Sequence, residues 1–187
     1  LEQECERALH HMRRVIEAEG PESVAAILVE AIPGTAGVIV PPPGYLAGLR
    51  ELADRFGAML VMDEVMAGFG RTGQWFAHHA HDVRPDLIAF AKGVNSGYVP
   101  VGGVVVSPEI HDTFTRRVFP GGLTYSGHPL AAASIVATLD AMASEGIVDH
   151  ARRIGEDVLG PGLAELAARH PMIGEARGVG VFWALDL

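Results

Sequence analysis

Hydrophobic residues recur every three or four positions in several segments, as they do on one face of a helix. The first segment ends at Gly20-Pro21 and places on its shared face Cys5, Leu9, Met12 and Ile16. The same spacing predicts three further helices, over residues 45–56, 129–144 and 147–170. We expect Gly160-Pro161-Gly162 to kink or split the last of them, because proline cannot continue the helical hydrogen bonding.

Short apolar runs between these segments predict buried strands. They are VAAILVE (24–30), AMLVMDE (58–64), DLIAFAK (86–92), VGGVVVS (101–107) and a last strand over 179–185. Strands that alternate with helices indicate an α/β fold with a mostly parallel sheet. A change of character near Glu145-Gly146 predicts two domains: residues 1–145 in an α/β domain, and residues 146–187 as the start of a smaller α+β domain.

Composition and charge exclude several classes of protein. Hydrophobic residues make up 49% of the 187 residues and charged residues 20%, which is typical of a folded domain. The net charge of -9 argues against binding to nucleic acid, and no apolar run approaches the roughly 18 residues of a membrane span. Cys5 is the only cysteine, which favours a reducing cytoplasm. The ends of the sequence lead us to expect a piece of a longer protein.

Three ionisable residues lie at or next to the ends of predicted strands: Glu30, Asp63 and Lys92. Open α/β sheets bind ligands at the carboxyl ends of their strands, so these residues form the candidate site. A single carboxylate at a strand end often only caps the next turn. Three such residues in one sheet favour a functional interpretation.

Lys92 is the only lysine among the 14 Lys and Arg residues. A lysine amine can lose its proton and attack a carbonyl carbon, whereas a guanidinium stays protonated. We expect the apolar run 87–91 to remove water from Lys92 and disfavour its charged form. The alternative is a surface lysine retained by chance.

Asp63 ends the run LVM, so its carboxylate should be partly buried and need a cationic partner. A pyridinium nitrogen is one such partner, and an arginine is the alternative. The next residue, Glu64, should point to the opposite face of the strand and serve the structure.

Two loops carry weaker signals. GGLTYSGHP (121–129) offers hydroxyl and backbone donors before a helix and could bind a phosphate. His78, His79 and His81 could indicate a metal, but they lack acidic or cysteine neighbours, so a solvated loop is the favoured interpretation.

Three long motifs carry a family resemblance: DEVMAGFGRTG (63–73), PDLIAFAKGVNSGYVPVGGVVVS (85–107) and GGLTYSGHP (121–129). Together they resemble the class III, or omega-type, aminotransferases, which are pyridoxal-phosphate (PLP) enzymes of fold type I. The resemblance extends over essentially the whole chain. It implies the large PLP-binding domain of that fold, followed by the start of the C-terminal small domain.

The resemblance also implies a role for each site residue. Lys92 forms the internal aldimine with PLP, Asp63 pairs with the pyridine nitrogen, and Val65 packs on the cofactor ring. Thr124 reaches the cofactor phosphate of the neighbouring subunit, which implies a homodimer with shared active sites. Glu30 matches a glutamate that pairs with a mobile substrate-binding arginine, and that arginine lies beyond the C-terminal end of this chain.

The resemblance implies transamination from an amino donor to a keto acid. The segment EAIPGTAG at Glu30 departs from the commonest family pattern, and the motifs look most like pyruvate-linked transaminases of taurine, β-alanine or other ω-amino compounds. Related proteins carry out aminomutase or decarboxylation chemistry on the same scaffold, and these reactions stay open. A noncatalytic domain that dimerises or binds a partner is the alternative from another class.

Overall fold

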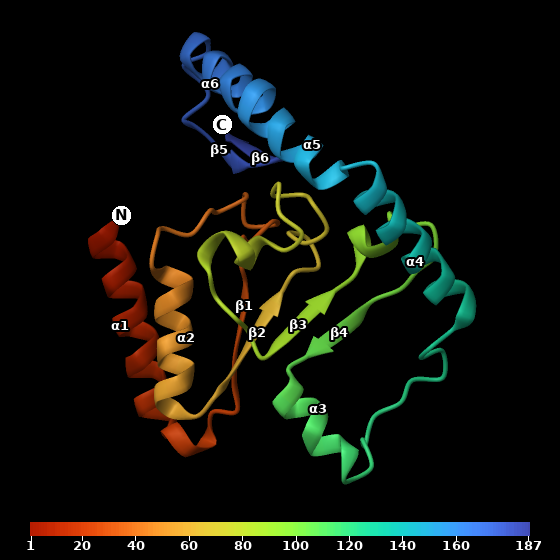
Figure 1. Ribbon diagram of the computed structural model, residues 1–187. Helices are drawn as coiled ribbons and strands as arrows, with labels where there is room; N and C mark the ends of the chain where they lie inside the picture. The colour runs from red at the N-terminus through yellow and green to blue at the C-terminus, as the bar shows by residue number, and fades with distance from the viewer.

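Four strands form the main sheet of the computed structural model, which describes residues 1–187 (Figure 1). In order across the sheet they are β1 (Ala26–Glu30), β2 (Met59–Asp63), β3 (Leu87–Phe90) and β4 (Gly103–Val106). β1, β2 and β3 are parallel, and β4 runs antiparallel to β3. The predicted α/β class with a mostly parallel sheet is confirmed.

The register of the parallel strands aligns their carboxyl ends. Glu30 of β1 lies opposite Asp63 of β2, and Asp63 lies opposite Ala89 of β3. The backbone N–H of Glu64 continues the pairing by donating to the carbonyl oxygen of Ala89, at 2.9 Å. The strand ends that the sequence marks as a candidate site therefore meet at one edge of the sheet.

Helices α1 (Glu2–Glu19) and α2 (Tyr45–Phe56) lie side by side, and α2 covers β1 and β2 (Figure 1). Leu60 and Met62, alternate residues of β2, are completely buried. Burial of such a side chain contributes about 1.5–3 kcal/mol, so this layer holds the core of the sheet. α2 ends at Gly57, which adopts a left-handed φ of 67° and donates its N–H to Ala53 and Asp54.

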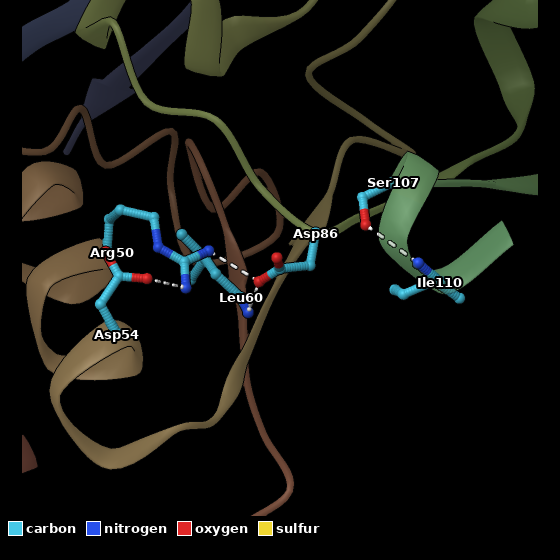
Figure 2. Close-up of polar contacts among 6 residues, drawn as sticks. All are labelled: Arg50, Asp54, Leu60, Asp86, Ser107 and Ile110. Carbon is cyan, nitrogen blue, oxygen red and sulfur yellow. Dashed lines mark hydrogen bonds and ion pairs between the residues drawn. The ribbon is translucent and has the colours of Figure 1, made fainter. Parts of the chain in front are cut away.

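Asp86 joins the amino ends of β2 and β3 to α2, as Figure 2 shows. Its Oδ2 accepts hydrogen bonds from the backbone N–H of Leu60 and from Nη1 of Arg50, both at 2.7 Å. Arg50 also pairs with Asp54 one turn further along α2. Burial acts to lower the pKa of Arg50, but the hydrogen bonds and charges of Asp86 and Asp54 outweigh it and raise the pKa.

The chain forms a helix after β4 that the hydrophobic pattern did not predict, α3 (Pro108–Thr115). Ser107 caps it by accepting a hydrogen bond from the backbone N–H of Ile110, and proline occupies the first helical position (Figure 2). Four short helical turns complete the connections: η1 (Pro21–Ser23), η2 (Ala77–His81), η3 (Lys92–Asn95) and η4 (Gly155–Leu159).

A helical run from α4 (Pro129–Ser144) through α5 (Ile147–Ile154) to α6 (Gly160–Arg169) leads from the sheet to the second sheet (Figure 1). It bends by 61° between α4 and α5. The predicted interruption of this helix is found directly before Gly160-Pro161-Gly162, where the π turn η4 separates α5 from α6, and α6 then continues through Pro161. A π turn shifts the hydrogen bonding by one residue and absorbs the missing proline N–H.

No single helix combines the length and the apolar composition needed to cross a membrane. The segments Pro129–Ser144 and Ile147–Arg169, which are bent relative to each other, reach that length and composition only when they are counted together.

The chain closes with an antiparallel hairpin of β5 (Glu175–Val179) and β6 (Phe182–Asp186). The single strand predicted over 179–185 is therefore wrong. Gly180 adopts a left-handed φ of 57° and reverses the chain between two apolar residues. The apolar run that predicts one strand is therefore divided by a turn between β5 and β6. The domain boundary near Glu145-Gly146 stays a prediction.

Glycines allow the hairpin to touch the rest of the molecule backbone to backbone. A side chain at Gly155 of the π turn would collide with the carbonyl group of Gly180. A side chain at Gly180 would in turn collide with the backbone of Thr72 and Gly73, and one at Gly73 would lie 2.9 Å from the Cβ of Arg152. The hairpin, the π turn and the 72–73 loop are thus interlocked without side chains between them.

Candidate active site

Asp63 lies where the sequence predicts, half-buried at the carboxyl end of β2. Its Oδ1 accepts a hydrogen bond from the backbone N–H of Val65 at 2.9 Å. Neither carboxylate oxygen pairs with an arginine, so the alternative of an Asp63–arginine ion pair is wrong in this structure. The other carboxylate oxygen of Asp63 accepts no hydrogen bond within the chain. It is free to accept one from a charged donor, which stabilises a carboxylate more strongly than a neutral donor does. Val65 is half-buried beside it.

Lys92 begins the turn η3, two residues after the end of β3. Its φ of 43° lies in the left-handed region, which is unusual for a residue with a side chain and is often found at functional sites. The amine makes no hydrogen bond and no ion pair within the chain. The expectation that residues 87–91 bury Lys92 is wrong, because these residues are only half-buried and the turn at Lys92 exposes it.

A cleft of about 490 Å³ lies beside Lys92. One wall is the segment Gly68–Arg71, and another is formed by Met142 and Ile147, where α4 meets α5. Val181, at the turn of the C-terminal hairpin, also lines this open cleft. The cleft therefore lies between the loop that follows β2 and the helices that lead to the hairpin.

Of the predicted site residues only Lys92 lines this cleft, and Glu30, Asp63, Val65 and Thr124 do not. Glu30 accepts a hydrogen bond from the backbone N–H of Gly34 at 3.2 Å and faces a mainly apolar hollow of about 380 Å³ against α1. Thr124 lies on the exposed 121–129 loop, beside a separate hollow of about 790 Å³ that reaches the start of α4. The structure brings together the strand ends that carry Glu30, Asp63 and Lys92 but leaves Thr124 apart.

Glu64 organises the wall of the cleft, a role that the sequence indicated only as structural. Its side chain is completely buried, and its carboxylate accepts hydrogen bonds from the backbone N–H groups of Ala77 and His78, both at 3.0 Å. Nδ1 of His78 lies 2.8 Å from the same carboxylate. Glu64 and His78 thereby close the loop 64–78, which carries the cleft residues Gly68–Arg71.

The prediction of a solvated loop holds for His79, which is exposed, but is wrong for His78, which is 4% exposed and bound to Glu64. No group of three or more His, Cys, Asp or Glu side chains is placed to hold a metal ion. Burial lowers the pKa of His79 and of His81, and the charge of His78 lowers both further. The Glu64 carboxylate acts to raise the pKa of both, and for His81 this effect is second in strength only to burial.

The fold and the site define an α/β domain whose ligand-binding edge lies at the carboxyl ends of parallel strands. The profile of the family described as aminotransferase class-III matches residues 1–187, and the chain belongs to this family. The predicted family is confirmed.

The chain is similar to characterised members of the family. It is 42% identical over 181 residues to the putrescine–pyruvate aminotransferase of Pseudomonas aeruginosa, a match that covers 96% of this chain and 40% of the relative. Its structure matches taurine:2-oxoglutarate aminotransferase from Bifidobacterium kashiwanohense, in complex with PLP and glutamate, with a TM-score of 0.95 and 48% identity. That match covers 98% of this chain and 41% of the other.

A third match is a thermostable (S)-enantioselective omega-transaminase from Thermomicrobium roseum, with a TM-score of 0.93 and 39% identity over 100% of this chain and 42% of the other. These likenesses confirm the predicted fold. The chain spans about two fifths of the length of the relatives it matches.

Proposed function

We propose that the protein carries out PLP-dependent transamination from an amino acid or ω-amino donor to a keto acid, with pyruvate as the acceptor. The observation that carries this proposal is the position of Lys92. The single lysine of the chain lies unpaired at the carboxyl edge of the sheet, beside the strand that Asp63 ends. The proposal is supported by family membership and by the relatives named for putrescine with pyruvate and for taurine with 2-oxoglutarate.

The residues present fit PLP. Lys92 would hold the cofactor through its amine, which has no acidic partner to hold it elsewhere. Asp63 supplies a half-buried carboxylate whose only hydrogen bond comes from Val65, so it can accept one from a protonated pyridine nitrogen. Val65, also half-buried, offers an apolar side chain to the ring.

When bound, PLP supplies an electron-withdrawing ring that stabilises negative charge on the substrate carbon. The chain supplies the proton handling. With the cofactor bound, the amine of Lys92 would act as the general base that moves a proton at the substrate carbon. Asp63 holds the proton on the ring nitrogen, because its negative charge favours the cationic form.

The active unit in this proposal is a homodimer with shared sites. Thr124 lies on a loop that is exposed along its length and apart from the Lys92 cleft, which favours a role toward another subunit. Leu123 and Tyr125, its neighbours, are 82% and 80% exposed. Apolar side chains that are this exposed indicate a surface covered by a partner.

Borohydride reduction of the PLP-loaded enzyme tests the attachment site. We expect digestion and mass spectrometry to find the pyridoxyl label on the peptide that contains Lys92, and Lys92→Ala to abolish it. A label on another residue, or none while the cofactor absorbance is present, would overturn the assignment. Release of carbon dioxide would indicate decarboxylation instead of transamination. A product in which the amino group has moved to another carbon of the same molecule would indicate aminomutation.

Mixing inactive subunits tests the shared site. If Thr124 serves the partner's cofactor, a heterodimer of Lys92→Ala and Thr124→Ala subunits carries both defects in one site and leaves the other intact, so activity partly returns. If Thr124 serves its own chain, every site carries a defect and mixing restores nothing. The comparison requires that subunits exchange, which a tagged wild-type subunit demonstrates.

A further inference from the structure

The turn η3, which carries Lys92, is anchored through its buried residues. The φ of Lys92, 43°, is left-handed, and a residue with a side chain keeps such a conformation only where the surrounding structure holds it. Val94 and Asn95, two and three residues further on, are each 1% exposed, whereas Lys92 is exposed and lines the cleft. The position of Lys92 therefore depends on what holds the buried half of its turn.

Asn95 is the only residue of η3 whose side chain forms hydrogen bonds. Its Nδ2 donates to the carbonyl oxygen of Val99 at 2.6 Å and to Oγ of Ser134 at 3.0 Å. Its Oδ1 accepts a hydrogen bond from the backbone N–H of Gly97 at 3.2 Å. Both N–H donors of the amide are used, and a buried polar group whose partners are all present favours a single arrangement.

These bonds join the turn of Lys92 to two other parts of the cleft. The bonds to Gly97 and Val99 close the segment 96–99, whose first two residues line the cleft beside Lys92. The bond to Ser134 reaches α4, which also carries the cleft residue Met142. The hydroxyl of Ser134 is itself fixed, because it donates to a carbonyl oxygen of α4 at 2.8 Å.

We infer that Asn95 is a positioning residue, which fixes the turn of Lys92 against α4 and so holds the Lys92 amine in place for proton transfer. This inference rests on the proposed function. Asn95 does not line the cleft, so it acts on the reaction through Lys92 and not by touching the donor. Displacing a reacting group by roughly 1 Å can cost about a hundredfold in rate, so the hold on this turn matters.

Asn95→Ala tests the inference, because it removes all three hydrogen bonds, and Ser134→Ala removes only one of them. Asp86→Asn is the matched control. Asp86 is also a half-buried polar residue that ties elements together, but it lies at the amino end of β3, away from the cleft. The control weakens the fold without touching the turn of Lys92, so it separates a loss of stability from a loss of position.

The first measurement is amide hydrogen exchange by mass spectrometry, on the full chain before PLP is added. The reporters are the N–H groups of Val94 and Ser96, which donate to carbonyl groups within the turn at 3.1 and 3.4 Å. We expect Asn95→Ala to speed the exchange of this peptide by about tenfold or more and Ser134→Ala by about threefold, in line with the number of bonds lost. Peptides from β2 should keep their rates, and Asp86→Asn should leave the turn unchanged.

The second measurement is steady-state kinetics of the PLP-loaded enzyme, with β-alanine as the donor and pyruvate as the acceptor. We expect Asn95→Ala to lower kcat by about tenfold or more. Its KM for β-alanine should change by less than about threefold, because no contact with the donor is lost. Asp86→Asn should keep kcat within about threefold of wild type.

Exchange that rises evenly along the chain in Asn95→Ala, or that stays unchanged in the turn, would overturn the inference. An unchanged kcat, a KM that rises while kcat is kept, or an equal loss of kcat in Asp86→Asn would overturn it as well. If Asn95→Ala does not fold, as judged by thermal melting, the same comparisons are made with Asn95→Asp, which keeps the size of the side chain and loses its N–H donors. A wild-type enzyme that binds PLP but turns over no amine would count against the proposed function, while hydrogen exchange still tests the hold of Asn95 on the turn.

Discussion

Replacing Glu64 with glutamine should loosen the wall of the cleft, because the buried carboxylate accepts three hydrogen bonds from one short segment. Two come from backbone N–H groups of Ala77 and His78, and the third comes from the ring of His78 at 2.8 Å. Glutamine has nearly the same shape, but its NH₂ group would face donors and leave one of them unsatisfied. Leaving a buried donor unsatisfied costs about 1 to 3 kcal/mol, and more next to a charged group, a large part of the roughly 5 to 15 kcal/mol that stabilises a typical protein.

Urea unfolding measures the effect, and Trp75 within the loop 64–78 provides a fluorescence signal close to the change. Glu17→Gln is the matched control, since Glu17 faces Arg13 at 3.8 Å on the surface and such pairs contribute about 0 to 1 kcal/mol. We expect Glu64→Gln to lower the free energy of unfolding by about 1.5 to 3 kcal/mol and the control to change it by less than about 1 kcal/mol. Equal effects of the two substitutions would refute the role assigned to Glu64.

Three further predictions follow from the site and the sheet. Asp63→Asn should keep the fold but lower turnover by about two to three orders of magnitude, and steady-state activity within about threefold of wild type would contradict the role of Asp63. Asp86→Asn should lower the free energy of unfolding by about 1 to 3 kcal/mol, because it removes the charge that holds Arg50, and an unchanged urea midpoint would contradict this. Because burial lowers the pKa of His79 and His81 below 6.5, the unfolded chain binds more protons in that range, so stability should be complete above pH 6.5 and fall as the pH drops below it. Melting temperatures from about pH 5 to pH 8 should show this fall, and replacing both histidines with glutamine should flatten it.

The sequence predicted those helices and strands whose ends are set by the spacing of apolar residues and by residues that stop an element. The helix that ends at Gly57 and the strand that ends at Asp63 follow from spacing and from residues that stop an element. Helix α3 was missed although Ser107 and Pro108 mark its start, because its eight residues bury no apolar face. The hairpin was missed because its turn needs only Gly180.

The sequence could predict a site residue only where its own chemical group and its place at a strand end mark it. Lys92 and Asp63 could be chosen from residue type and position, but their exposure depends on neighbours that are remote in the sequence. The partnership of Glu64 with His78 spans 14 positions and appears only when the loop closes. Arg71 could not be distinguished from the other arginines, because what marks it is its place in the wall of the cleft.

The interlock of Gly73, Gly155 and Gly180 limits how this protein can change in evolution or in the laboratory. Where backbones touch, even one added methyl group must push whole segments apart, so no conservative substitution exists at these positions. Walls made of side chains, such as Phe69 and Met142, can be reshaped one residue at a time. Variants with altered substrate preference should therefore accumulate at the side-chain walls of the cleft, while the three glycines remain fixed and carry the hairpin, with Val181, unchanged from one specificity to the next.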